Sequence, residues 1–171
     1  MIEDWPSHIA VAAQVRQHLA ARDDLMAYPL PGVAATEEQI AAAEREIGPL
    51  DPQYRVFLGF ADGWQGFLQE TDLFGTAQLR GAAPMGTARR QLDVLEDEVW
   101  EHLGVRPDDV HVIGASETTT DLWLISRPGT PRAGEVVWFW GSDLERYPDF
   151  GEFYLTMVDY NRLELQRLAG K

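Results

Sequence analysis

Hydrophobic and polar residues near the start of the chain follow the spacing of an amphipathic helix. Residues 1–29 predict a leader helix with Asp4 as a candidate N-cap. Its apolar positions include Ile9, Val15 and Leu19. The sequence Tyr-Pro-Leu-Pro-Gly then ends the helix, because proline and glycine interrupt its backbone hydrogen bonds.

Two further helices are expected to begin at capping signals. Thr36 is followed three residues later by Gln39, which is the spacing of a capping box. Asp51 and Pro52 supply an N-cap and the first helical position of the next helix. Each helix carries an apolar stripe that predicts burial. The stripe residues are Ile40, Ala43, Ile47, Tyr54, Phe57, Leu58 and Ala61.

Residues 87–104 return to a helical pattern and predict one helix with an acidic stripe. Asp93, Asp97 and Glu101 succeed one another at a spacing of four residues and share one face of this helix. Like charges at that spacing repel by a few tenths of a kcal/mol, about 0.2–0.5 per pair, unless cations approach. The inward face consists of Leu92, Leu95, Val99 and Leu103.

The rest of the chain has the pattern of strands and a closing helix. Asp62-Gly63 predicts a turn into a first strand or hairpin, and a helix is expected to begin near Asp149. Helices followed by antiparallel strands and a last helix predict a single α+β domain, with a mostly antiparallel sheet packed against helices. The other strands are expected at residues 110–115, 121–126 and 135–140.

Length and composition agree with one globular domain over residues 1–171. The chain has 45% hydrophobic and 25% charged residues and no cysteine, which excludes thiolate chemistry and cysteine-ligated zinc. No apolar run approaches the roughly 20 residues that cross a bilayer. The first residues carry acids where a secretory signal has lysine or arginine, so we expect a cytoplasmic protein.

Charge is the most informative part of the composition. With 28 acidic and 14 basic residues, the net charge is −14. Such a charge repels nucleic acid and anionic lipid and accelerates encounter with a basic protein, although it also serves solubility alone. The acids concentrate in residues 91–121 and 135–159, where they are interleaved with tryptophans, which are preferred interface anchors.

Catalytic and metal-binding patterns are absent from the sequence. The four histidines lack the spacing of a metal site, and Gly114 to Thr118 lack the closing glycine of a nucleophile elbow. No phosphate-binding glycine motif occurs, so no cofactor or metal is predicted. A hydrolase that uses paired carboxylates is the remaining enzymatic alternative, because acids are abundant.

The segment from residue 31 to residue 64 resembles the amino-terminal signature of the SMI1/KNR4-like, or SUKH, superfamily. It reads PGVAATEEQIAAAEREIGPLDPQYRVFLGFADGW. The resemblance extends over about residues 30–165 and implies that residues 1–29 and 87–104 are additions to the family core. Asp62 departs from the usual asparagine of the Asn-Gly pair. The matching positions are Glu44, Gly48, Pro52, Tyr54, Leu58 and Gly63.

The resemblance implies a protein-binding module without catalysis. Many bacterial members resemble immunity proteins that neutralise a nuclease or related domain of a polymorphic toxin, whereas eukaryotic members are regulatory interaction proteins. We therefore expect a basic protein partner, first a cognate toxin domain and alternatively a host protein, and no nucleic acid or membrane. Charge density, and not a family motif, selects the candidate interface. Its residues are Asp93, Asp97, Glu101, Glu117, Asp121, Trp140, Asp143 and Glu145.

Overall fold

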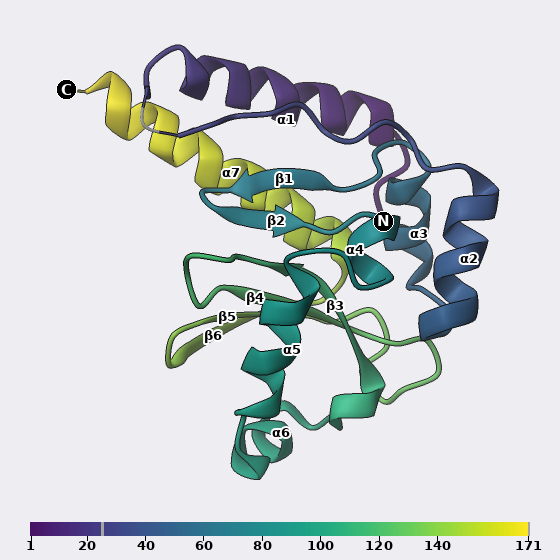
Figure 1. Cartoon of the computed structure of the whole chain (residues 1–171). Coiled ribbons are helices and arrows are strands. Elements are labelled where there is room, and N and C mark those ends of the chain that lie inside the picture. Colours follow the sequence, from purple (N-terminus) through teal and green to yellow (C-terminus); the bar gives the residue numbers. More distant parts are fainter. Residues whose placement is uncertain (25, 171) are drawn as a thin grey trace.

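The computed structural model describes residues 1–24 and 26–170 (Figure 1). Leu25 and Lys171, which the predicted boundaries include, lie outside the described residues. One antiparallel sheet of six strands forms the centre, with the strands in sequence order, and this confirms the predicted α+β domain. The strands are β1 (Trp64–Leu68), β2 (Thr71–Leu73), β3 (Val110–Ala115), β4 (Leu122–Ser126), β5 (Val136–Trp140) and β6 (Asp143–Tyr147).

The helices start where local side chains satisfy free backbone N–H groups. The Thr36 hydroxyl accepts a hydrogen bond from the Gln39 amide, while Asp51 and Asp149 cap the third and last helices, as predicted. Asp4 caps the leader helix, which ends at Ala20. The helices are α1 (Trp5–Ala20), α2 (Glu37–Ile47), α3 (Pro52–Leu58), α4 (Thr76–Leu79), α5 (Met85–Asp93), α6 (Asp97–Leu103) and α7 (Phe150–Ala169), with a 3-10 turn η1 (Pro107–Asp109).

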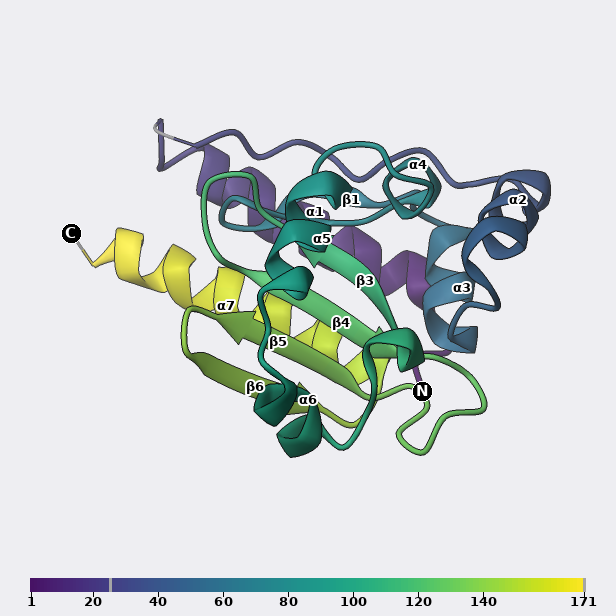
Figure 2. The same cartoon turned by 60° about the horizontal axis from the view of Figure 1, so that its bottom comes forward.

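Helices cover both faces of the sheet (Figure 2). On one face, Phe153 of α7 packs edge-on against Trp123 of β4, with ring centroids 5.1 Å apart. Helix α1 lies along α7, and its Trp5 is 1% exposed and contacts the rings of Phe57 and Tyr154. The leader helix is therefore part of the hydrophobic core. Helices α5 and α6 lie over the other face.

The single helix predicted for residues 87–104 is wrong, because the chain forms α5 and α6 with a break between them. Glu96 adopts an extended conformation, with φ −71° and ψ 153°, and α6 starts after it. Trp100 falls beside the predicted apolar stripe, and in the broken arrangement both Trp100 and Leu103 are buried. Burial of this large side chain favours the break. As a result, Asp93 and Asp97 belong to different helices.

Strand β6 was not predicted. It pairs with β5 across the two-residue connection Gly141-Ser142, in which Gly141 has a φ of +66°. Glycine at the first position of such a connection is typical of tight hairpins, so the signal for this strand was present in the sequence. Its alternating acidic residues Asp143 and Glu145 mask the strand pattern and protect a sheet edge from unwanted pairing.

Candidate functional site

Three aromatic side chains lie in a row on the α7 side of the sheet. Trp138 and Trp140 alternate with the buried Phe139 along β5 and therefore share one face. The ring centroids of the two tryptophans are 4.6 Å apart. Tyr160 of α7 meets Trp138 edge-on at 5.7 Å. We call Trp138, Trp140 and Tyr160 the aromatic ladder, and all three are half-buried.

Three carboxylates accompany the aromatic ladder. Asp121 accepts a 2.7 Å hydrogen bond from the indole N–H of Trp138, and Glu145 accepts one of 3.3 Å from the Tyr160 hydroxyl. Burial and Glu145 raise the pKa of Tyr160, which keeps its hydroxyl a neutral donor. Asp143 lies opposite Trp140 in the β5–β6 register.

None of the ion pairs within the described ranges includes these three carboxylates. The six side chains thus form a negatively charged aromatic surface, which we call the acidic aromatic surface. A cation is attracted both by the carboxylates and by the ring faces of such a surface. Its residues are Asp121, Trp138, Trp140, Asp143, Glu145 and Tyr160.

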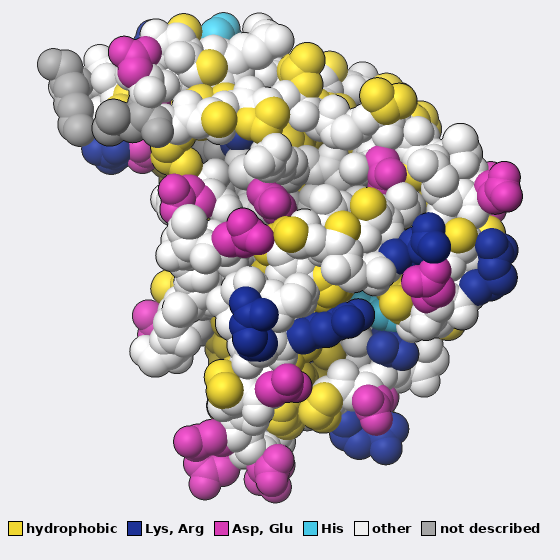
Figure 3. All heavy atoms as spheres, in the orientation of Figure 1, with side chains coloured by type: hydrophobic (Ala, Val, Ile, Leu, Met, Phe, Trp, Pro, Cys, Tyr) yellow, Lys and Arg dark blue, Asp and Glu magenta, His cyan; other side chains and the backbone are white. Residues whose placement is uncertain are grey.

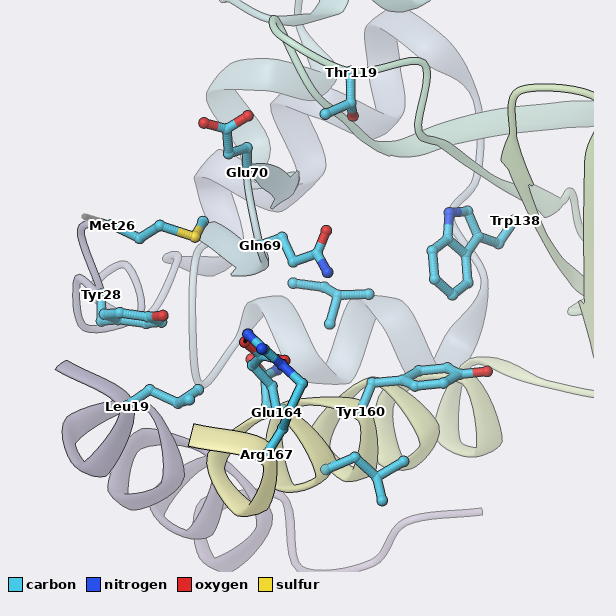
Figure 4. A pocket seen from close by; sticks show the side chains of 13 residues that line it. Leu19, Met26, Tyr28, Gln69, Glu70, Thr119, Trp138, Tyr160, Glu164 and Arg167 are labelled. Atoms are coloured by element: carbon cyan, nitrogen blue, oxygen red, sulfur yellow. Dashed lines mark hydrogen bonds and ion pairs between the residues drawn. The ribbon is translucent and has the colours of Figure 1, made fainter. Parts of the chain in front are cut away.

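A pocket of about 600 Å³ opens beside this surface, between α1, α7 and the β1–β2 hairpin. Figure 4 shows Trp138 and Tyr160 on one side of it and Glu70 and Tyr28 on another. We call it the ladder pocket, because Trp138 and Tyr160 belong to both features. Its lining residues are Leu19, Met26, Tyr28, Leu68, Gln69, Glu70, Thr119, Trp138, Tyr160, Asn161, Leu163, Glu164 and Arg167.

A buried arginine fixes one wall of the ladder pocket. Arg16 of α1 is 2% exposed and donates a 3.1 Å hydrogen bond to the carbonyl of Phe67, which also accepts from the Asn161 amide. The Arg16 guanidinium carbon lies 5.1 Å from the centre of the Tyr28 ring. Burial lowers the pKa of Arg16 to about 10, so the side chain stays charged at neutral pH. This contact holds Tyr28 against the pocket.

The match to a known family supports the sequence signature. The sequence model of the family described as SMI1 / KNR4 family (SUKH-1) matches residues 34–156 of this chain. The chain belongs to the SMI1/KNR4 family. Among curated proteins, none matches this sequence.

The matched range of this SMI1/KNR4-family chain includes part of the candidate site and leaves part of it out. It runs from the segment before α2 into α7, so α1 and residues 157–169 of α7 lie outside it. Tyr160 is consequently outside the matched range, while Trp138 and Trp140 are inside. At the departure from Asn-Gly, Asp62 accepts hydrogen bonds from the amide and hydroxyl of Thr76 at 2.5 and 2.8 Å and so connects the turn to α4.

The fold brings only part of the predicted interface together. Asp121, Trp140, Asp143 and Glu145 belong to the acidic aromatic surface. Glu117 lies in the loop between β3 and β4, which Asp121 ends, and no hydrogen bond or ion pair joins it to the surface within the described residues; after burial, it contributes to a raised pKa of Asp72.

The three acids on α5 and α6 lie across the sheet from that surface. Arg146 alternates with Glu145 on β6 and donates to the carbonyls of His102 and Leu103 at the end of α6. Figure 3 shows that acidic side chains gather over α6, while basic side chains cross the same view from α5 toward α2. The α5–α6 face therefore has mixed charge. The acids separated in this way are Asp93, Asp97 and Glu101.

Two residues of the surface were absent from the predicted interface. Trp138 was expected only as one of the tryptophans near acidic residues, and three other tryptophans, Trp64, Trp100 and Trp123, are buried in the core. Tyr160 carries a weaker signal, because it lies two helical turns after Phe153 and so faces the same sheet. Their meeting depends on packing between β5 and α7.

A second pocket is lined by two carboxylates, and both of them have a structural role. Asp62 and Asp72 line a pocket of about 420 Å³. Burial raises the pKa of Asp72, which accepts a 2.6 Å hydrogen bond from the Gly66 amide. Since Asp62 also receives two hydrogen bonds from Thr76, both groups stabilise backbone turns.

The described residues offer no metal-ligand cluster and no bilayer-crossing segment. Within residues 1–24 and 26–170, no three acidic, histidine or cysteine side chains converge as metal ligands. His111 is buried and contacts the Pro49 carbonyl at 3.0 Å, and burial lowers its pKa to about 4. In the same ranges, every helix is too short or too polar to span a lipid bilayer.

Proposed function

We propose that this SMI1/KNR4-family chain is a non-catalytic protein-binding domain, and specifically an immunity protein that neutralises a basic, nuclease-type toxin domain in the cytoplasm. The acidic aromatic surface is the observation that supports this proposal most directly. Its carboxylates have no basic partner within the described part of the chain, and its rings are half-buried. Protein interfaces favour such aromatic anchors inside a polar rim.

The electrostatics of the chain support a nucleic-acid-binding target. A nuclease domain presents a basic groove to phosphates, and a protein of net charge −14 is attracted to such a groove from a distance. Long-range attraction accelerates association and weakens with salt, whereas packing of the aromatic ladder slows dissociation. An inhibitor of this kind covers the groove and competes with nucleic acid.

The structural use of Asp62 and Asp72 supports binding over hydrolysis. Each of these carboxylates accepts a hydrogen bond from a backbone amide and stabilises a turn, so its position and its hydrogen bonds are explained by a structural role. A regulatory interaction protein of the SMI1/KNR4 type is the second candidate, because family membership is compatible with it. The identity of the partner separates the two, since an immunity gene is expected beside the gene of a large secreted toxin.

The proposal is tested with the toxin domain encoded next to this gene. The purified chain should bind that domain with an association rate that falls steeply with salt, and co-expression should rescue bacteria from the toxin. A chain that neither binds at low salt nor protects would contradict the immunity function. Capture of a cellular regulatory protein, with no protection, would favour the second candidate.

A further inference from the structure

We propose that the ladder pocket receives an arginine side chain of the basic partner, with its guanidinium group between the aromatic rings and Glu70; this inference rests on the proposed function. The pocket combines ring faces, apolar walls and an acid at one site (Figure 4). Its volume of about 600 Å³ lies within the range of pockets that enclose a ligand group, about 300–1,000 Å³.

The walls of the pocket match the two parts of an arginine side chain. Leu68 and Leu163 offer apolar surface for its methylene stem. Trp138 and Tyr160 offer ring faces for its cation. The indole N–H of Trp138 is already hydrogen-bonded to Asp121, and this charged acceptor increases the negative potential of the ring.

Carboxylates outnumber arginines around the pocket in the part of the chain that the structure describes. Two arginines adjoin it, Arg16 over the Tyr28 ring and Arg167 in the lining. Four carboxylates accompany it, with Glu70 and Glu164 in the lining and Asp121 and Glu145 bonded to the ring residues Trp138 and Tyr160. Arg167 lines the pocket but pairs with Glu164, three residues before it. Glu70 accepts a hydrogen bond from the Thr118 hydroxyl and belongs to no ion pair within residues 1–24 and 26–170. The carboxylates of the acidic aromatic surface add to the negative potential beside Trp138.

The geometry favours arginine over lysine. A planar guanidinium stacks on an aromatic ring and still donates hydrogen bonds to a carboxylate from its edge, whereas an ammonium is more strongly hydrated and has no flat face. The molecule contains one such contact itself, because the Arg16 guanidinium lies over the Tyr28 ring at the wall of this pocket.

The experiment uses the full chain and short peptides, so that it does not require the toxin. Gly-Ser peptides with blocked ends carry a single central arginine, lysine or citrulline as their only variable residue. They are titrated into the protein while the indole N–H resonance of Trp138 is followed by NMR. Citrulline has the shape of arginine without its charge. The arginine peptide should shift this resonance in a saturable manner, lysine should bind several-fold more weakly, and citrulline should leave the resonance unchanged.

Matched variants locate the binding. Glu70→Gln should lower the affinity for the arginine peptide by at least about fivefold, which is a loss of about 1 kcal/mol of binding free energy. Glu101→Gln removes the same charge from α6 on the other face and should change the affinity by less than twofold, or about 0.4 kcal/mol. The thermal unfolding of both variants should match the native chain, which separates loss of binding from loss of fold.

Different results overturn the arginine site and the immunity function. No shift at millimolar arginine peptide, equal binding of citrulline, or equal affinity of Glu70→Gln and the native chain would overturn the arginine site. Binding of the adjacent toxin domain with no effect of Glu70→Gln on dissociation would do the same and leave the immunity function intact. Arginine binding at Trp138 without toxin binding would keep the pocket and remove the immunity function.

Discussion

Trp138 and Asp121 connect the core of the domain to its acidic surface. The indole N–H of Trp138, on β5, donates a 2.7 Å hydrogen bond to Asp121, which immediately precedes β4. Trp138 is also the register partner of the fully buried Trp123 on the neighbouring strand β4. The orientation of one half-buried ring is therefore determined by the sheet on one side and by a carboxylate on the other.

Replacing Asp121 should distinguish its charge from its hydrogen bond. Asp121→Asn keeps an acceptor for the indole N–H and should change the free energy of unfolding by less than about 1 kcal/mol, whereas Asp121→Ala leaves the donor unpaired and should cost about 1–2 kcal/mol. Urea denaturation measures both values. Equal stability of the two variants would mean that water replaces Asp121 at no cost.

Charge reversal should identify the face that meets a basic partner. The double variant Asp143→Lys with Glu145→Lys should slow association at low salt by about tenfold, because it reverses the local field. The matched control is Asp93→Lys with Glu101→Lys, which changes the net charge equally on the α5–α6 side. Stopped-flow association compares the two, and equal slowing would show that only total charge matters.

The leader helix should be indispensable, although the family match starts after it. Trp5→Ala should lower the free energy of unfolding by about 3–5 kcal/mol, because the ring is fully enclosed by Phe57, Phe150 and Tyr154. Trp5→Phe should recover part of this loss. Denaturant unfolding provides the measurement, and a loss below about 1 kcal/mol would mean that α1 is only loosely attached.

The fold was predictable wherever the signal was local. Thr36, Asp51 and Asp149 predict helix starts, because each cap accepts a hydrogen bond from a backbone amide within three residues. The break before α6 was not predictable in this way, because burial of Trp100 against the rest of the domain decides it. Tertiary packing overrides helical spacing at this position.

The candidate site was predictable only in part for the same reason. Asp143 and Glu145 stand out by their charge, and both belong to the surface. Charge alone does not tell which face of the sheet an acid occupies, so Asp97 was grouped with residues that lie across the sheet. The contact between Trp138 and Tyr160 depends on how α7 crosses β5, which sequence spacing does not specify.

Acidification should destabilise the fold through His111. The ring is 4% exposed and its Nε2 contacts the Pro49 carbonyl, and burial together with Arg127 lowers the pKa of His111 to about 4. The ordinary pKa in the unfolded chain is about 6.5. Between these values the unfolded chain binds more protons than the folded chain, so the free energy of unfolding decreases as the pH falls from about 6.5 to about 4.

The matched variant for this prediction is His111→Gln, which keeps an N–H donor for the Pro49 carbonyl and does not titrate. Burial raises the pKa of Asp51 and Asp72, so their protonation favours the folded state on acidification and partly hides the histidine effect. Both proteins contain these acids, and the difference between their unfolding free energies isolates His111. Between pH 7 and pH 4, the native chain should lose about 3 kcal/mol more free energy of unfolding than the His111→Gln variant loses. Parallel stability profiles of the two proteins in chemical denaturation would show that His111 is protonated in the folded state without cost.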